Sequence, residues 1–237
     1  MSDPREADYD AFFGVIRVSG VSAALLVSEA LTTTVSAMAS LPEAAAEPTL
    51  HEALDAARLA PVAAPGLTPD APAQQRWMHG HRLFFALTQA AIVGLQDALA
   101  APSARSCGPG AQATHVFLRA SAAAMRLTAS FPPSDYQRTV RPSMTPPQHP
   151  ATGFSGLWSA DHRVLITRLR AWGAMHRAIC ADSCMIRRRI FDAVDEVYGA
   201  HIGVCERFVG DGPSLLGGSE NSMATLGELA RRRRGLL

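Results

Sequence analysis

The chain has 237 residues, long enough for one large domain or two small ones whose core needs neither metal nor disulfide staples. Hydrophobic residues make up 48% and charged residues 18%, a globular composition that excludes a largely disordered chain. The formal net charge of +1 gives no reason to expect a nucleic-acid or a membrane partner.

The first residues predict a cytoplasmic protein. Acidic residues at Asp3 and Glu6 stand where a signal peptide would carry its basic region. The most apolar early stretch, residues 18–28, is too short to span a bilayer. We therefore expect the four cysteines to be reduced, and each needs an explanation as a core residue, a metal ligand or a reactive thiol.

Helical spacing of apolar residues, broken by proline and glycine clusters, runs through the chain, and strand patterns are nearly absent. This predicts an all-α fold with a single domain over residues 1–237. The expected helices cover residues 7–40, 49–60, 74–100, 112–130, 157–181, 186–209 and 222–234. A loop is expected at 61–73. A long proline-rich segment without helical period is expected at 131–156, and an ordered loop of that length is often functional.

The strongest candidate site lies in the helix expected at 186–209. His201 and Cys205 are four residues apart, so on a helix both side chains point to one face. That spacing lets an imidazole reach a heme iron while the thiol reaches the porphyrin edge, where it could form a single thioether. A histidine above a buried cysteine has the same spacing, and spacing alone favours this purely structural alternative.

The preceding helix repeats the pattern with His176, Cys180 and Cys184. Three donors on one helical face could suggest zinc. Structural zinc sites, however, usually use short Cys-x-x-Cys loops that wrap the ion, and no fourth ligand is evident. We therefore interpret Cys180 and Cys184 as core residues.

The residues after His201 resemble tryptophan 2,3-dioxygenases. That family's proximal-histidine helix and glycine-rich loop are similar to HIGVCERFVG at 201–210 and LGGS at 216–219. Its arginine-bearing segment is similar to YQR at 136–138 with the stretch 142–155, and its distal-histidine helix resembles HRLF at 81–84. Two features depart from that family: Leu216 replaces the loop threonine, and the chain is shorter between the arginine and the proximal histidine.

Cys205 is absent from the dioxygenases and indicates a different branch. His162 and His201, with 38 residues between them, form together with Cys205 a pattern that resembles His-x(n)-His-x-x-x-Cys. This motif belongs to heme-dependent aromatic oxygenases that hydroxylate tyrosine or 3-methyltyrosine in antibiotic pathways. The resemblance implies that His162 and His201 are axial ligands of a heme and that Cys205 is its covalent anchor.

The same resemblance implies residues for proton transfer and substrate binding. His81 would be the distal acid–base group, with a pKa near 6.5; His79, or a plain solvent-facing His81, is the alternative. Arg138 would hold the substrate carboxylate, because a guanidinium fork matches a carboxylate bidentately, and Arg141 is nearly as suitable. Either arginine could instead stabilise the loop. Ser219 would close over the amino-acid end of the substrate or form part of a turn.

We therefore expect a tryptophan 2,3-dioxygenase-like helical bundle that encloses a heme. It would hydroxylate the ring of L-tyrosine or a close analogue, such as 3-methyl-L-tyrosine, with hydrogen peroxide. The aromatic amino acid and hydrogen peroxide are the expected partners, and a homo-oligomer is compatible with the sequence. Either His162 or His81 could be the sixth ligand of the resting iron, and a His162 ligand must leave before peroxide binds.

Two alternatives stay open. The nearest is a tryptophan or indole oxygenase that uses the same heme site. The other is a non-catalytic heme sensor or a helical interaction protein. The two histidines would form a stable six-coordinate heme site in the sensor, and their spacing would be a coincidence in the interaction protein.

Overall fold

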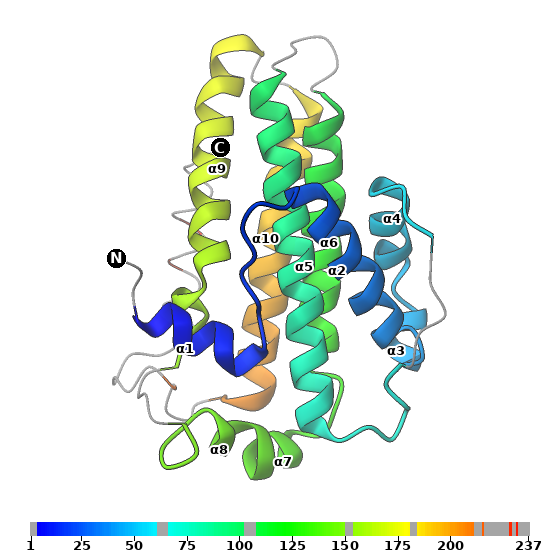
Figure 1. Cartoon of the computed structure of the whole chain (residues 1–237), viewed down its shortest axis with the longest axis vertical. Helices are drawn as coiled ribbons and strands as arrows, with labels where there is room; N and C mark the ends of the chain where they lie inside the picture. The colour runs from blue at the N-terminus through cyan, green and yellow to red at the C-terminus, as the bar shows by residue number, and fades with distance from the viewer. Residues whose placement is uncertain are drawn as a thin grey trace.

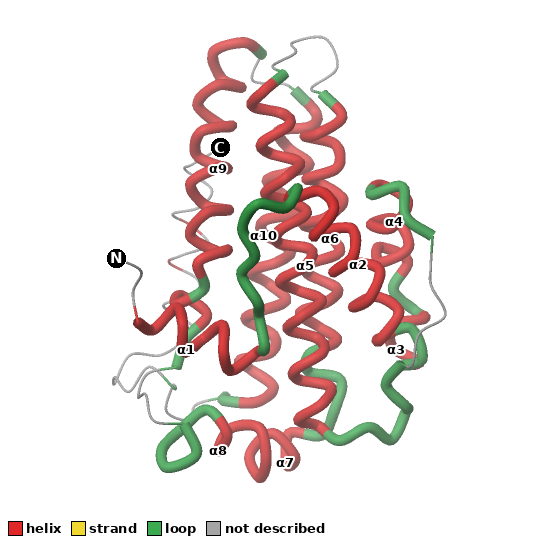
Figure 2. The backbone as a smooth tube through the Cα atoms, viewed as in Figure 1, coloured by secondary structure: helices red, strands yellow, loops and turns green. Residues whose placement is uncertain are grey.

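A computed structural model of the chain describes residues 4–60, 66–101, 108–149, 154–180 and 184–210, with Leu215, Glu228 and Arg231 beyond them. Within these residues the chain forms helices and no strand, which confirms the predicted all-α fold. The four longest helices of this described part run along the long axis as the main bundle (Figures 1 and 2): α5 (Ala73–Ala100), α6 (Pro109–Leu127), α9 (Ala160–Ile179) and α10 (Met185–Phe208).

Shorter helices surround this bundle. α2 (Ala23–Met38) packs along α5, and α4 (Pro48–Ala56) packs against α6. The short α3 (Pro42–Ala45) connects α2 to α4. Near the other side, α1 (Pro4–Phe13) contacts α5.

The N-terminal part differs from the prediction of one helix over 7–40. α1 ends at Phe13 and α2 begins at Ala23. Gly14 and Gly20 adopt positive φ angles of 66° and 78°, a conformation that terminates a right-handed helix. The prediction was wrong because the apolar spacing continues across both glycines.

Within the proline-rich segment at 131–156, residues 133–143 are helical, against the prediction. They form α7 (Pro133–Asp135), the π-helix η1 (Tyr136–Val140) and α8 (Arg141–Ser143), which close one end of the bundle (Figure 1). Pro133 and Pro142 stand in the first turns of their helices, where proline is tolerated because the N–H it lacks has no partner there. The expected helix at 222–234 lies mostly outside the described residues.

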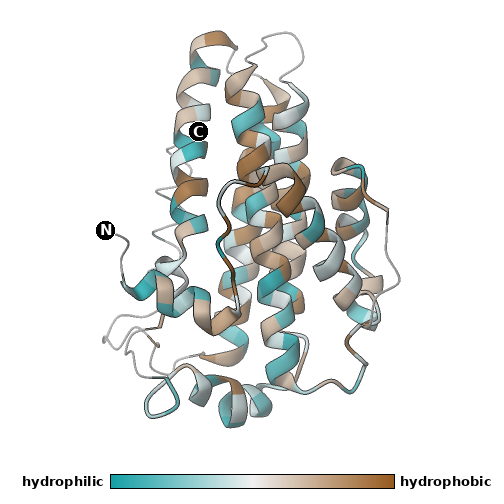
Figure 3. Ribbon diagram, in the orientation of Figure 1, coloured by the Kyte–Doolittle hydropathy of each residue, from teal (hydrophilic) through white to brown (hydrophobic). Residues whose placement is uncertain are grey.

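α5 is the central helix and contacts α6, α2 and α9. It passes close to α6 at Gly94, where a Cβ atom would lie 2.8 Å from the Gly110 carbonyl oxygen, so only glycine allows this approach. By length and composition α5 could cross a membrane, but 61% of its most apolar window is buried inside the bundle. Hydrophobic and hydrophilic residues alternate around the helices, as expected when one face packs inward (Figure 3).

The buried residues form two clusters of different composition. One is mainly Leu and Ala, contributed by α2, α4, α5, α6, α9 and α10. The other is mainly aromatic. Its rings, many of them in edge-to-face or stacked contact, are Tyr9, Phe13, Trp77, Phe85, Phe131, Tyr136, Phe154, Trp158 and Phe208. A cavity lies beside this aromatic cluster.

Candidate active site

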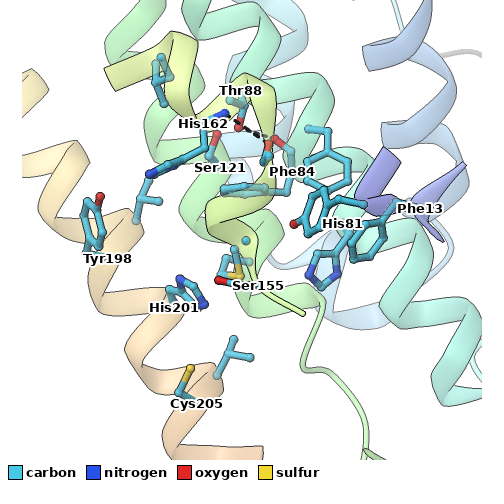
Figure 4. A pocket seen from close by; sticks show the side chains of 18 of the residues that line it. Phe13, His81, Phe84, Thr88, Ser121, Ser155, His162, Tyr198, His201 and Cys205 are labelled. Carbon is cyan, nitrogen blue, oxygen red and sulfur yellow. Dashed lines mark hydrogen bonds between the residues drawn. The ribbon is translucent and has the colours of Figure 1, made fainter. Parts of the chain in front are cut away.

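A cavity of about 250 Å³ is lined by residues of α5, α9 and α10. This is close to the lower end of the range for small-molecule sites, roughly 300–1,000 Å³. Most of its wall is aromatic or aliphatic, and three histidines and one cysteine line it: His81, His162, His201 and Cys205. Figure 4 shows His201 and Cys205 extending from α10, with His81 on the opposite side. The structure thus brings together the four residues that the sequence analysis assigned to heme binding and proton transfer.

α10 supplies two of these groups. It is continuous from Met185 to Phe208, so His201 and Cys205 lie one turn apart on the same face. Burial lowers the pKa of His201, which keeps the imidazole neutral, the form that can bind a metal. Burial, with a smaller contribution from Glu206, raises the pKa of Cys205 to about 11, so its sulfur stays a thiol at neutral pH.

The first turn of α9 positions His162. The Ser159 hydroxyl oxygen accepts a hydrogen bond from the His162 backbone N–H at 3.3 Å and caps the helix. The neighbouring Asp161 is buried and accepts hydrogen bonds from Gln89 of α5 and from Arg17. These charge-assisted contacts fix the start of α9, and with it His162, against α5.

His81 is held tightly on α5. Its Nδ1 lies 2.8 Å from the Trp77 carbonyl oxygen, which can only accept, so Nδ1 carries the proton and Nε2 keeps its lone pair. The ring stacks on Phe13, with centroids 4.6 Å apart, and packs against the Trp77 ring at 4.3 Å. Burial lowers the pKa of His81 to about 4, and nearby His201 contributes in the same direction.

These observations rule out one alternative for the distal histidine and correct one expectation. His81 is 9% exposed rather than solvent-facing, and its pKa lies well below the expected 6.5. The other candidate, His79, is half-buried and is not part of the cavity wall.

The structure does not bring Arg138 to the cavity. Its side chain projects from the π-helix η1, is 73% exposed and forms an ion pair with Asp135. Burial raises the pKa of Tyr136, which lines the cavity, to about 12, and the charge of the half-buried Arg141 acts against that rise. Arg141 is not part of the cavity wall either, but it is less exposed than Arg138 and its charge acts on Tyr136 in that wall, so the carboxylate-binding role fits Arg141 better than Arg138. Ser219 lies outside the described residues.

Two buried polar groups in the wall escaped the sequence analysis. The Tyr198 hydroxyl and the Trp77 indole N–H have no hydrogen-bond partner among the described residues, and both side chains line the cavity. Buried polar atoms are normally paired, so these two are available to a ligand. Tyr198 lies three residues before His201, and helical spacing alone could have placed it on the same face.

Comparisons with known proteins agree with this site. Residues 1–184 match the sequence model of a family described as SfmD 3-methyl-L-tyrosine peroxygenase. The chain belongs to this family of oxidoreductases. It is 29% identical over 264 aligned residues to a 3-methyl-L-tyrosine peroxygenase of Streptomyces lavendulae, an alignment that covers 98% of this chain and 71% of that protein. No solved structure matches the chain.

Family membership confirms the resemblance to the tyrosine-hydroxylating branch. The family match ends before His201 and Cys205, so the roles of these two residues depend on the geometry of α10. The relation to tryptophan 2,3-dioxygenases stays a prediction.

Proposed function

We propose that the chain is a heme-dependent peroxygenase that hydroxylates the ring of 3-methyl-L-tyrosine or a close analogue with hydrogen peroxide. One observation carries this proposal: three imidazoles and a thiol line one mostly aromatic cavity, in a member of a 3-methyl-L-tyrosine peroxygenase family. The substrate class comes from the name of the relative and from the aromatic wall, against which a phenol ring would pack.

The residues present fit a heme. Imidazole is a common axial ligand of heme iron, and His201 is a neutral imidazole whose ring borders the cavity. The apolar wall would cover a porphyrin, and the unpartnered Tyr198 hydroxyl and Trp77 indole offer hydrogen bonds to a bound group. When bound, heme would activate the peroxide and transfer one oxygen atom, while the protein sets ligand, polarity and pose.

Cys205 would anchor the cofactor on the same face as His201. Its S–H group would add across a vinyl C=C bond, so that a C–S bond forms and the hydrogen goes to the second carbon, with no net oxidation. A thiol with a pKa of about 11 is a poor iron ligand in competition with the neutral imidazole four residues earlier. This division of roles makes His201 the ligand and Cys205 the tether.

His81 would act as the acid–base group that transfers a proton during the reaction. Its Nε2 lone pair is available, because Nδ1 is committed to the Trp77 carbonyl. With a pKa of about 4 the ring is neutral at pH 7; it would be a weak base that takes a proton from peroxide or from the phenol and returns it readily. Arg141 would bind the substrate carboxylate.

Turnover followed by mass spectrometry tests the proposed function. The heme-loaded protein with hydrogen peroxide should add one oxygen atom to 3-methyl-L-tyrosine or L-tyrosine, and His51→Gln, at an exposed position on α4, should match the wild type. Addition of two oxygen atoms to L-tryptophan would instead identify a dioxygenase. No product, together with a heme spectrum unchanged by every amino acid, would identify a non-catalytic heme protein.

A further inference from the structure

Three metal-binding side chains meet at the end of the α9–α10 hairpin remote from the cavity. The ligand atoms of His176, Cys180 and Cys184 lie within 4.8 Å of one another. Met185, next to this cluster, and His201 are 16 residues apart on α10, which places them about 24 Å apart along the helix axis. None of the three lines the cavity, so this cluster is separate from the proposed heme site.

The end of α9 explains why the three donors converge. On one continuous helix, residues eight positions apart lie about 12 Å apart along the axis, too far to share an ion. Instead α9 ends at Ile179, and Cys180 adopts extended angles (φ −122°, ψ 150°). Cys184 then begins α10 and faces back toward the end of α9. The hairpin therefore wraps the donors around one point, which the sequence pattern did not reveal.

His176 adds a second, independent observation. Its ring is only 3% exposed, and neither Nδ1 nor Nε2 has a hydrogen-bond partner among the described residues. The ring packs against Trp172, with centroids 4.8 Å apart, and an indole face satisfies neither nitrogen. Buried polar atoms without partners are rare, and here they lie beside two sulfur atoms.

Neither cysteine is fully buried, although Cys184 packs against the Leu- and Ala-rich core, in line with its interpretation as a core residue. Both are half-buried, so an ion can reach them from solvent.

We propose that His176, Cys180 and Cys184 bind Zn²⁺, with a water molecule as fourth ligand. One imidazole and two thiolates form a soft donor set, which suits Zn²⁺ and excludes the oxygen-preferring Mg²⁺ and Ca²⁺. Zn–S bonds of about 2.3 Å and Zn–N bonds of about 2.0–2.1 Å require donors roughly 3.5–3.8 Å apart, so donors that now lie within 4.8 Å of one another would approach by at most about 1 Å. Binding converts both thiols to thiolates and releases two protons to solvent.

Such an ion would tie the end of α9 to the start of α10. These are the helices that carry His162 and His201. The proposal does not depend on heme or on any activity, because it uses only side chains at the opposite end of the hairpin.

Zinc content and zinc coordination test the proposal in the purified full-length chain. After reduction, addition of Zn²⁺ and dialysis, elemental analysis should find one zinc per wild-type chain. X-ray absorption at the zinc edge should show two sulfur ligands at about 2.3 Å and nitrogen or oxygen ligands at about 2.0–2.1 Å. Cys180→Ser, Cys184→Ser and His176→Gln should each weaken zinc binding on the order of 100-fold or more, since even outer-shell changes cost about 10–100-fold.

Two matched controls separate this site from other thiols and histidines. Cys205→Ser removes a cysteine with the same spacing at the other end of the hairpin, and His51→Gln removes an exposed histidine; both should keep one zinc. In the wild type alone, added Zn²⁺ should raise the melting temperature, a readout that needs no variant to fold.

Three results would overturn the proposal. The first is zinc in the wild type no higher than in the Cys180→Ser variant, with no thermal shift. The second is zinc bound only by nitrogen and oxygen. The third is a Cys180–Cys184 disulfide that persists in protein isolated with reductant, which would make the cysteines a redox pair instead.

Discussion

The hairpin of α9 and α10 carries the spacing His-x-x-x-Cys near each of its ends. At one end His201 and Cys205 lie on an unbroken helix and face a cavity of about 250 Å³. At the other end His176 packs against Trp172, the helix stops, and Cys184 returns from the next helix to within 4.8 Å. The spacing places two side chains on one face of a helix. The surroundings of that face then determine which ligand fits: a cavity suits a large flat ligand, and a second cysteine close by suits a single ion.

The largest effect should follow from removing His201. His201→Ala deletes the proposed ligand next to the proposed anchor, so heme content should fall to background in a pyridine hemochrome assay, and hydroxylation should disappear. His176→Gln removes the histidine of the other end and should retain full heme content. Equal heme loss in both variants would mean that the two ends are not distinct sites.

The next effect separates the two remaining histidines of the cavity. His81→Ala should keep heme and substrate binding but slow turnover, because general acid–base assistance is worth about 10²–10⁴-fold. His162→Ala should shift the ferric spectrum from six-coordinate low-spin toward high-spin and make peroxide react more readily. If His81→Ala causes the spectral shift and His162→Ala does not, His81 is the sixth ligand.

The buried histidines should also make the heme-free protein sensitive to acid. Because the pKa of His81 is lowered to about 4 in the folded state, the unfolded state binds more protons between pH 6.5 and pH 4. The free energy of unfolding should therefore fall as the pH drops through this window, by about 3 kcal/mol from His81 alone. Urea unfolding at several pH values measures this slope, and His81→Gln should flatten it. An unchanged slope would contradict the neutral, buried His81.

A smaller effect should distinguish the two arginines. Arg141→Leu should weaken binding of 3-methyl-L-tyrosine to the heme-loaded protein by about 2 kcal/mol, or roughly 30-fold, as expected for loss of a partly buried charge pair. Arg138→Leu should change the dissociation constant less than about twofold, since an exposed ion pair contributes little. Spectral titration with the substrate measures both. A larger effect of Arg138→Leu than of Arg141→Leu would assign the carboxylate-binding role to Arg138 instead.

Much of the fold could be predicted from the sequence, and the predictions that were wrong have physical causes. α5, α6 and α10 were predicted within about three residues because their apolar spacing is uninterrupted. The break between α1 and α2 was missed because positive φ at Gly14 and Gly20 leaves the apolar pattern intact. The helical turns within 131–156 were missed because a proline in a first turn has the same composition as a proline in a loop.

Some residues of the candidate site could likewise be predicted from local sequence spacing, and others could not. His201 and Cys205 could be paired from local spacing, whereas His81 and His162 were found only through family resemblance. The low pKa of His81 depends on Phe13 and Trp77, which pack around it from α1 and α5, and no local pattern encodes that burial. Cys184 can approach His176 only because α9 ends between them. The helical periodicity of the sequence did not indicate that end.

Intact-protein mass spectrometry after acid-acetone extraction tests the central claim most directly, namely that Cys205 tethers a heme beside its ligand His201. The wild type and Cys180→Ala should both retain a mass equal to protein plus heme, and Cys205→Ala should lose the heme while some binding persists before extraction. Complete extraction of heme from the wild type, or heme retained by Cys205→Ala, would contradict the account.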